Sequence, residues 1–305
     1  MIGRFTFLGT SFDLSDASRP IRDAVRMFWD VAELADLAIA ARNRSVRVRS
    51  TGPLRAAQRR SFAVTGPDER GLVIESGAEH ALVMSETLAA SLVVDGDGFV
   101  IDVSGDESTQ PLALHVALAE VVASSGLLPL HASVVTRDGR TVALTGPSGA
   151  GKTTSAMLAV LEGWRFVAED SSWLDPVTCT VVGSDVDVRL RAGAESLLTA
   201  PLRAKLGLDL AALEHDGVKR VVPYAAVGGR TRVAMLDELV VLAPRDSPEL
   251  DGPLRPAELA MALHQAAGVP LLGMVRSARA EIIRALTIRL SARRLSSPSG
   301  RSGLA

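Results

Sequence analysis

A glycine-rich turn followed by two adjacent acids is the part of this sequence best suited to chemistry. The turn, GPSGAGKT, fits the pattern G-x-x-x-x-G-K-[ST] at every fixed position. Glycines let successive backbone N–H groups turn inward around an anion, and a helix that follows directs its positive end at the same anion. We therefore predict that this turn binds nucleotide phosphates. The residues concerned are Gly146, Pro147, Ser148, Gly149, Ala150, Gly151, Lys152, Thr153 and Thr154.

Lys152 and Thr153 carry the two side chains that a phosphate site of this kind uses. Lys152 supplies a mobile positive charge for the β- and γ-phosphates, and the Thr153 hydroxyl is placed to bind Mg²⁺. Lysine is rare in this chain, since Lys205 and Lys219 are the only others. A purely structural glycine turn is the alternative, but the apolar strand pattern before the turn and the helix pattern after it favour phosphate binding.

The two acids, Glu169 and Asp170, lie only 17 and 18 residues beyond Lys152, at the end of the strand-like segment RFVAE. A right-handed crossover would lay this segment parallel to TVALT, so that both strands end at the edge where ligands collect in α/β sheets. One carboxylate could then hold Mg²⁺ while the other accepts a proton from an attacking hydroxyl. The alternative is an exposed acidic pair that opens the loop SSWLDP.

The elements expected around these residues indicate an α/β core. LLPLHASVV and TVALT are expected to form a hairpin through the turn RDGR. A helix is expected over about 152–162, ended by Gly163. CTVVGSDVDVRL is expected to contain strand, LDELVVLAP to be a late buried strand, and residues 192–214 to be at least partly helical. Residues 255–295 carry two helical patterns separated by Gly268-Val269-Pro270.

The first part of the chain has a different pattern, which predicts a separate α+β domain. AVRMFWDVAELADLAIAARN has a helical pattern, and SVRVRS, GLVIES and SLVVDG are strand-like. Alternation in SVRVRS puts Val46 and Val48 on one face and Arg47 and Arg49 on the other. The predicted domains are an N-terminal domain over 1–120, a core over 121–250, C-terminal helices over 251–295 that pack on the core, and a flexible tail over 296–305.

Composition and charge exclude several classes of protein. The 305 residues are 47% hydrophobic and 22% charged, with a formal net charge of −2, so no overall field would draw the chain to nucleic acid or to an anionic membrane. Cys179 is the only cysteine, which rules out an intramolecular disulfide and agrees with a reducing compartment. The N-terminus lacks the apolar core of a signal peptide. We therefore expect a soluble, cytoplasmic protein that binds neither nucleic acid nor a membrane.

Three motifs in order, LHASVV, GPSGAGKTTSAML and GWRFVAED, resemble the HPr kinase/phosphorylase family and its shorter, stand-alone relatives. The likeness covers roughly residues 125–190. It implies the variant P-loop fold shared with phosphoenolpyruvate carboxykinase, which has a mixed sheet. It also implies a kinase that uses ATP and Mg²⁺ to phosphorylate a serine hydroxyl of a protein or peptide. Some stand-alone relatives modify peptide precursors, as in lasso peptide maturation, and the N-terminal domain would then recruit the substrate. Because hexamers occur in the related family, a homo-oligomer is compatible with this likeness.

The resemblance also assigns roles to single residues. His131 matches the family histidine, Asp170 the acid that accepts the proton, and Glu169 the acid beside it, where the family has two aspartates. Lys152 completes the predicted catalytic set. VDVRL resembles the family's acid-x-arginine strand, which makes Asp187 a candidate metal contact, alongside Thr153 and Glu169, and Arg189 a candidate phosphate contact. From the residues alone, His131 could equally be a satisfied core histidine.

Two other functions are compatible with the same residues. The first is a small-molecule kinase that phosphorylates free serine, a sugar or an amino-alcohol. The second is a switch or scaffold that binds ATP without transferring phosphate, although the joint presence of His131, Lys152 and Asp170 favours an enzyme.

Overall fold

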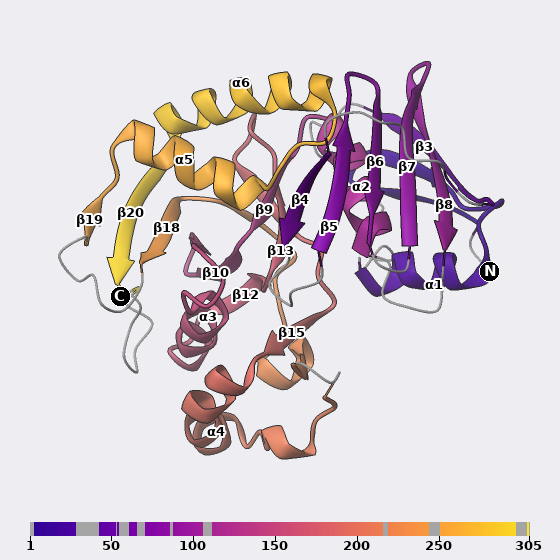
Figure 1. Ribbon diagram of the computed structural model, residues 1–305. Helices are drawn as coiled ribbons and strands as arrows, with labels where there is room; N and C mark the ends of the chain where they lie inside the picture. Colours follow the sequence, from indigo (N-terminus) through magenta and orange to yellow (C-terminus); the bar gives the residue numbers. More distant parts are fainter. Residues whose placement is uncertain are drawn as a thin grey trace. The chain divides into compact units, whose positions relative to one another are not determined.

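The chain divides into two units, which are described in turn (Figure 1). The computed structural model describes residues 3–28, 43–52, 54, 61–65, 71–85, 88–105, 112–215, 219–243, 251–296 and 304. Unit 1 consists of Met1–Leu128 and Val269–Ile282, and unit 2 of Pro129–Gly268 and Ile283–Ala305. These limits differ from the predicted domain limits, because residues 269–282 group with the N-terminal residues.

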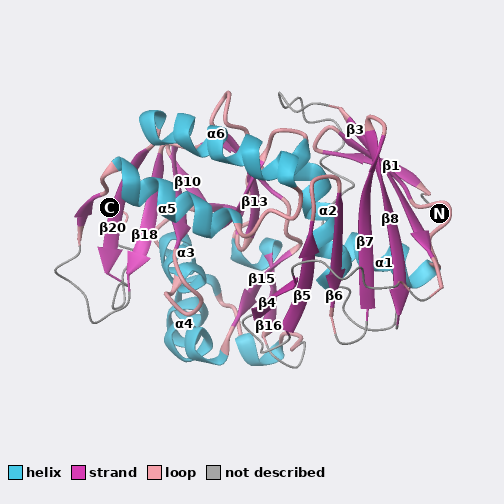
Figure 2. Ribbon diagram, turned by 45° about the horizontal axis from the view of Figure 1, so that its top comes forward, coloured by secondary structure: helices cyan, strands magenta, loops and turns pink. Residues whose placement is uncertain are grey.

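Unit 1 is built on a mixed sheet. In the described residues this sheet has eight strands in the order β1-β2-β3-β8-β7-β6-β5-β4. Its neighbours pair antiparallel except β2–β3 and β3–β8, which pair parallel. Helix α2 packs against β6 and β7 (Figure 2). The bounds are β1 Arg4–Phe7, β2 Thr10–Asp13, α1 Arg19–Phe28, β3 Arg44–Ser50, β4 Ser61–Thr65, β5 Gly71–Ser76, β6 His80–Met84, β7 Leu88–Asp95, β8 Gly98–Gly105 and α2 Leu112–Ser124.

The alternation predicted for SVRVRS is confirmed in β3. Val46 and Val48 are buried, whereas Arg47 is exposed. Such alternation is expected of a strand with one face on the core and one face in water. Of the long helical pattern predicted over 24–43, residues 24–28 belong to α1, and 29–42 lie outside the described residues.

A buried carboxylate in α2 holds the segment 269–282 within unit 1. Glu120 Oε1 accepts hydrogen bonds from the backbone N–H of Leu271 at 2.9 Å and of Leu272 at 2.7 Å. Its second oxygen lies 3.7 Å from the Arg279 guanidinium, and the two side chains are only 3% and 5% exposed. Burial raises the pKa of Glu120, while these N–H donors and Arg279 act in the opposite direction. The segment thus supplies the partners that this buried charge requires.

Unit 2 contains the elements around the glycine-rich turn, and its largest sheet is also mixed. Over the described ranges this sheet has six strands in the order β12-β10-β11-β18-β20-β19. Strands β11, β18 and β20 are parallel, whereas β10 is antiparallel to β11 and to β12. Helices α3 and α4 pack against each other (Figures 1 and 2). The bounds are β9 Leu128–His131, β10 Ser133–Arg137, β11 Arg140–Thr145, α3 Lys152–Leu161, β12 Arg165–Ala168, β13 Ser171–Leu174, β14 Thr180–Gly183, β15 Asp187–Leu190, α4 Ala192–Leu206, η1 Leu210–Ala212, β16 Arg220–Pro223, η2 Tyr224–Val227, β17 Val233–Met235, β18 Glu238–Ala243, β19 Gly252–Pro253, α5 Pro256–Ala267, α6 Gly273–Arg289 and β20 Ser291–Ser296. Of these, Leu128 at the start of β9 and residues 273–282 of α6 belong to unit 1.

The predicted hairpin is formed by β10 and β11. Asp138 and Gly139 in its turn have φ values of 51° and 81°, as a two-residue type I′ turn requires. Because β12 is antiparallel to β10, it runs in the same direction as β11, with β10 between them. Strands β11 and β12 therefore end at the same edge of the sheet, as predicted, although they are not neighbours.

The end of the chain corrects one prediction. Helices α5 and α6 confirm the two helical patterns, but residues 291–296 form strand β20, which lies between β18 and β19. The two arginines in SARRLS interrupt the apolar pattern by which a strand is recognised in a sequence. In the fold their charges are paired, since Arg293 lies 2.8 Å from Glu238 and Arg294 lies 3.7 Å from Glu258.

The predicted flexible tail is described at only two positions. Ser296 is the last residue of β20. Leu304 is fully buried, and its carbonyl accepts a hydrogen bond from Arg140 at 3.1 Å. The other tail residues lie outside the described ranges, so the flexible tail stays a prediction.

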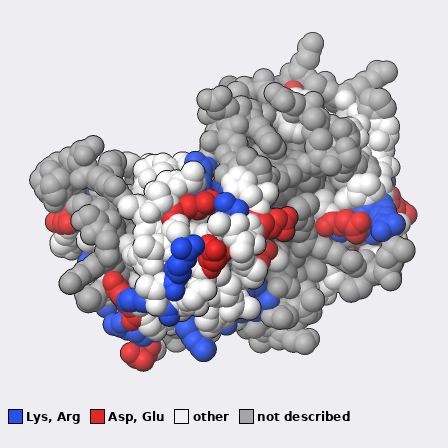
Figure 3. Space-filling view, turned by 90° about the horizontal axis from the view of Figure 1, so that it is seen from below, with Lys and Arg blue, Asp and Glu red and all other residues white. Residues whose placement is uncertain are grey.

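The described residues were predicted to form no membrane-spanning helix and to carry charges of both signs. None of the helices in the described part of the chain is both long and apolar enough to cross a membrane. On the face drawn in Figure 3, acidic and basic side chains are interspersed. This mixture matches the small net charge of −2.

Gly183, which has no side chain, allows β14 to lie close to β12, the strand that leads to the two acids. A Cβ placed on Gly183 would lie 1.9 Å from the carbonyl oxygen of Val167. That oxygen belongs to the backbone of β12 and cannot move away as a flexible side chain could. Gly183 is therefore required for the position of β14.

Gly183→Ala is expected to lower the free energy of unfolding by about 3 kcal/mol, because the added methyl group forces the two strands apart. Urea denaturation would measure the change. Gly193→Ala is the matched control, since a Cβ there meets no atom within 4 Å. Equal effects of the two substitutions would contradict this account of Gly183.

Candidate active site

The glycine loop, residues 146–151, connects the end of β11 to the start of α3. Gly149 and Gly151 have φ values of 81° and 94°, a conformation that glycine adopts without a steric penalty. The N–H of Ala150 donates to the Pro147 carbonyl at 3.2 Å. The loop is thus a compact turn, followed by Lys152, Thr153 and Thr154 as the first residues of α3.

Helix α3 begins with N–H groups that no side chain caps. Its N-cap is Gly151, which makes no side-chain hydrogen bond. The first N–H groups of an α-helix lack an intrahelical acceptor, and the helix dipole gives this end a partial positive charge. Uncapped donors that follow a glycine loop fit the oxygens of a phosphate group.

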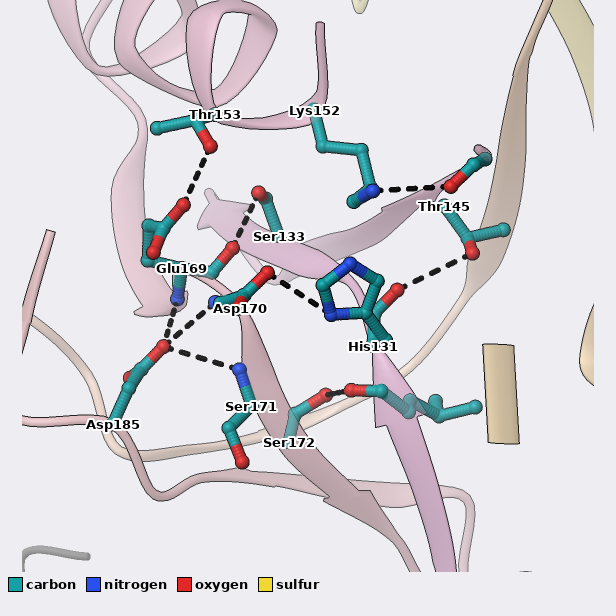
Figure 4. A network of polar contacts seen from close by, with 12 residues as sticks. His131, Ser133, Thr145, Lys152, Thr153, Glu169, Asp170, Ser171, Ser172 and Asp185 are labelled. Atoms are coloured by element: carbon teal, nitrogen blue, oxygen red, sulfur yellow. Dashed lines mark hydrogen bonds and ion pairs between the residues drawn. The ribbon is translucent and has the colours of Figure 1, made fainter. Parts of the chain in front are cut away.

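The Lys152 side chain lies over the glycine loop (Figure 4). Its Nζ donates to the carbonyl oxygens of Gly146 at 3.0 Å and of Pro147 at 3.4 Å. Burial lowers the pKa of Lys152, whereas the negative charges of Asp170 and Glu169 raise it. The ammonium group is therefore held next to the loop by carbonyl oxygens that an anion could replace.

Thr153 and Glu169 join the start of α3 to the end of β12. The Thr153 hydroxyl donates to Glu169 Oε1 at 2.5 Å. Glu169 is buried. Burial and the neighbouring charge of Asp170 raise the pKa of Glu169 well above its ordinary value, against the hydrogen bond from Thr153. The hydroxyl and the carboxylate thus lie together, as the prediction of a shared metal site requires.

Asp170 lies beside His131, which ends β9. His131 Nδ1 is 3.0 Å from Asp170 Oδ1, and the two side chains are 52% and 44% exposed. The alternative of a core histidine is therefore wrong. Desolvation by the surrounding atoms lowers the pKa of His131, the charge of Asp170 raises it, and the charges of Lys152 and Lys219 lower it. His131 and Asp170 form an accessible pair next to the buried Glu169.

Two predicted site residues lie on a different sheet from β11, the strand that precedes the glycine loop. Asp187 and Arg189 belong to β15, which pairs with β16 in a two-stranded sheet. Asp187 pairs in register with Pro223, and Arg189 with Val221. Their roles as metal and phosphate contacts stay predictions.

Asp185 is the acid that contacts the predicted site, and it is absent from the residues that the sequence patterns single out. Its Oδ2 accepts hydrogen bonds from the backbone N–H of Glu169 and of Asp170. The only sequence signal is the pair of acids in GSDVDVRL, and the resemblance favoured Asp187. Ser133, whose hydroxyl donates to the Glu169 carbonyl at 2.5 Å, gave no signal at all.

The residues present fit a Mg²⁺ ion bound together with phosphates. Within the described ranges, no group of three or more His, Cys, Asp or Glu side chains could hold a metal ion alone. Mg²⁺ usually takes only one or two protein ligands, completed by phosphate oxygens and water. The Thr153 hydroxyl and the Glu169 carboxylate are hard oxygen donors of this kind, and the uncapped end of α3 lies beside them.

Comparisons with known proteins leave the activity open. The sequence matches no protein-family model and no curated protein. A solved structure of the Hpr(Ser) kinase/phosphatase from Coxiella burnetii is similar over 56% of this chain and 85% of that chain, with 12% sequence identity and a TM-score of 0.28. A likeness at this TM-score does not define an activity.

Glu169→Gln is expected to stabilise the protein at neutral pH when nucleotide and metal are absent. Burial raises the pKa of Glu169 above its ordinary 4.5, so the folded state binds a proton more tightly than the unfolded chain. The cost of ionising this group is absent below about pH 4.5 and grows as the pH rises above it. The variant should therefore have a Tm higher by at least about 2 °C at neutral pH, and the difference should shrink towards acid pH.

Thermal unfolding followed across this pH range would measure the effect. Glu281→Gln provides the control, because Glu281 is exposed on α6. A lower Tm of Glu169→Gln at neutral pH would show that the ionised form of Glu169 is stabilised in the folded protein, contrary to this interpretation.

Proposed function

We propose that this protein is an ATP- and Mg²⁺-dependent phosphotransferase that phosphorylates a serine hydroxyl of a protein or peptide, such as a precursor peptide. One observation carries the proposal. The glycine loop and the start of α3 face a buried carboxylate, 2.5 Å from the Thr153 hydroxyl, and the next residue is a second carboxylate, 3.0 Å from His131. A phosphate cradle with one enclosed and one accessible acid has the parts that phosphoryl transfer needs.

Each residue would have a separate task in this reaction. The N–H groups of the glycine loop and of the start of α3, with the Lys152 ammonium, would bind the triphosphate. Thr153 and Glu169 would hold Mg²⁺, which neutralises charge on the phosphate oxygens when it is bound. Asp170 would accept the proton of the acceptor hydroxyl, and His131 would fix the orientation of its carboxylate.

The bond changes balance with these groups alone. The acceptor oxygen forms a bond to the γ-phosphorus, and the bond from that phosphorus to the β–γ bridging oxygen breaks. ADP leaves with the bond electrons, and the acceptor proton goes to Asp170. The protein's contribution is mainly positioning and charge neutralisation.

The exposure of Asp170 and His131 favours a large acceptor. Their side chains are 44% and 52% exposed, so a serine on a peptide could reach Asp170 without entering an enclosed cavity. Incubation with ATP and Mg²⁺ of a peptide pool and, separately, of a metabolite pool, followed by mass spectrometry, would test this choice. Phosphorylated metabolites without phosphorylated peptides would indicate a small-molecule kinase. ATP binding without any phosphorylated product would indicate a non-catalytic switch.

Lys152→Ala is expected to lower phosphoryl transfer by at least about 100-fold, because the charge nearest the loop is lost where negative charge develops. ATP affinity should fall as well, since Lys152 would contact the ground-state phosphates. Turnover assays and calorimetric titration with ATP would measure both changes. Lys205→Ala is the matched control, because Lys205 is exposed and donates to the Leu161 carbonyl instead. Unchanged ATP affinity in Lys152→Ala would place the phosphates elsewhere.

Asp170→Asn is expected to lower kcat by about 100-fold or more, because an amide cannot accept the proton. The affinity for ATP with Mg²⁺ should stay within about threefold of the original value, since Asp170 makes no ground-state phosphate contact in this mechanism. Single-turnover kinetics and nucleotide titration would separate the two quantities. Asp209→Asn is the matched control, because Asp209 is 49% exposed and pairs with Arg203. A near-normal kcat in Asp170→Asn would show that Asp170 is not the proton acceptor.

A further inference from the structure

The backbone that carries the two acids is bound by one side chain. Asp185 Oδ2 lies 2.5 Å from the backbone nitrogen of Glu169, 2.8 Å from that of Asp170 and 3.3 Å from that of Ser171 (Figure 4). Successive N–H groups that converge in this way form a nest for an anion. Here the anion is a carboxylate from the same chain, so the peptide groups of both acids have a fixed orientation.

The second oxygen of Asp185 is held from the other side. The Tyr224 hydroxyl donates to Oδ1 at 2.8 Å, and Arg230 lies 3.3 Å from the same oxygen. Arg230 also donates to the backbone carbonyl of Asp185. Its guanidinium stacks 4.5 Å above the Tyr224 ring, a favourable cation–π contact. We call Asp185, Tyr224 and Arg230 the carboxylate clamp.

The carboxylate clamp is enclosed, and this strengthens its contacts. Asp185 and Tyr224 are buried, and the Arg230 side chain is only 7% exposed. Burial raises the pKa of Asp185, but the hydrogen bonds from Asp170, Tyr224 and Glu169 and the charge of Arg230 act against it. All the named partners of its two oxygens are donors, which suits an ionised carboxylate.

The opposite side of the acid-bearing loop is held as well. The Ser133 hydroxyl on β10 donates to the Glu169 carbonyl at 2.5 Å. With Asp185 on the N–H side and Ser133 on the carbonyl side, the peptide groups around Glu169 cannot rotate without breaking hydrogen bonds. Glu169 and Asp170, whose side chains contact Thr153 and His131, are both attached to this fixed backbone.

We propose that Asp185 is the positioning residue of this active site and that the carboxylate clamp holds Glu169 and Asp170 in the geometry that transfer requires. The catalytic meaning of this inference rests on the proposed function. In this role Asp185 acts through the backbone of the two acids and not through a contact with nucleotide or acceptor. Its contribution is to keep two like-charged side chains apart and directed at different partners, one at Thr153 and one at His131.

Two substitutions separate this role from a general effect on folding. In Asp185→Asn the amide oxygen can still occupy the N–H nest, but the charge is lost and the amide N–H groups face Arg230. Tyr224→Phe removes a single donor to Oδ1 and keeps the ring, which packs edge-on against Phe166 at 5.5 Å. Asp175→Asn is the matched control, because Asp175 is a buried acid of unit 2 that accepts hydrogen bonds from Val177 and Thr178.

The experiment compares kcat, the ATP dissociation constant and the Tm of these variants with those of the original protein. Asp185→Asn should lower kcat by about 100-fold and leave ATP affinity within about threefold, because only the acids lose their orientation. Tyr224→Phe should lower kcat by a smaller factor, and Asp175→Asn should leave it unchanged. A kcat of Asp185→Asn within about threefold of the original value would overturn the inference. Equal losses of kcat in Asp185→Asn and Asp175→Asn would overturn it too.

Amide hydrogen exchange tests the clamp independently of activity. The N–H groups of residues 169–171 should be protected in the original protein and exchange faster in Asp185→Asn, while amides of β11 keep their protection. If the original protein phosphorylates no acceptor, the proposed function fails, but this exchange pattern would still support the positioning role. Exchange at 169–171 that is the same in both proteins would overturn the inference.

Discussion

Three carboxylates lie together at the end of β12, and the surrounding structure is arranged so that they can coexist. Glu169, Asp170 and Asp185 would repel one another if each were left to itself in a poorly solvated region. Each has its own partner instead. Glu169 receives the Thr153 hydroxyl, Asp170 lies next to His131, and Asp185 is surrounded by N–H and O–H donors. The separation of roles among chemically similar groups follows from these different surroundings.

The topology of unit 2 explains why so short a segment can bring these groups together. The chain leaves β11, forms the glycine loop and α3, and returns on β12, which runs in the same direction with β10 between them. The loop and the acids therefore emerge at one edge of the sheet. Strand β9 adds His131 from a second sheet, and Gly183 allows β14 to lie against β12 so that Asp185 follows directly behind the acids.

Parts of this arrangement follow local rules and could be predicted from the sequence. The glycine loop, α3 and the hairpin turn at Asp138 and Gly139 depend on residues close together in the chain, and all three were expected. Asp185 could not be distinguished from Asp187, because the choice depends on where β14 ends relative to β12. Strand β20 was predicted as helix because two arginines interrupt its apolar pattern, and their partners Glu238 and Glu258 are far away in sequence.

Each unit combines segments that lie far apart in the sequence, and this has a consequence for folding in the cell. During synthesis α2 is made long before Leu271 and Leu272, so the Glu120 carboxylate first has none of its native backbone donors. In the same interval β20 has not been made, so β18, which pairs with β20 in the native sheet, is temporarily an edge strand. Native contacts of both units are complete only after residues 269–296 have left the ribosome. Neither unit can therefore complete its native contacts before that point, and the unpaired edge of β18 is open to aggregation until then.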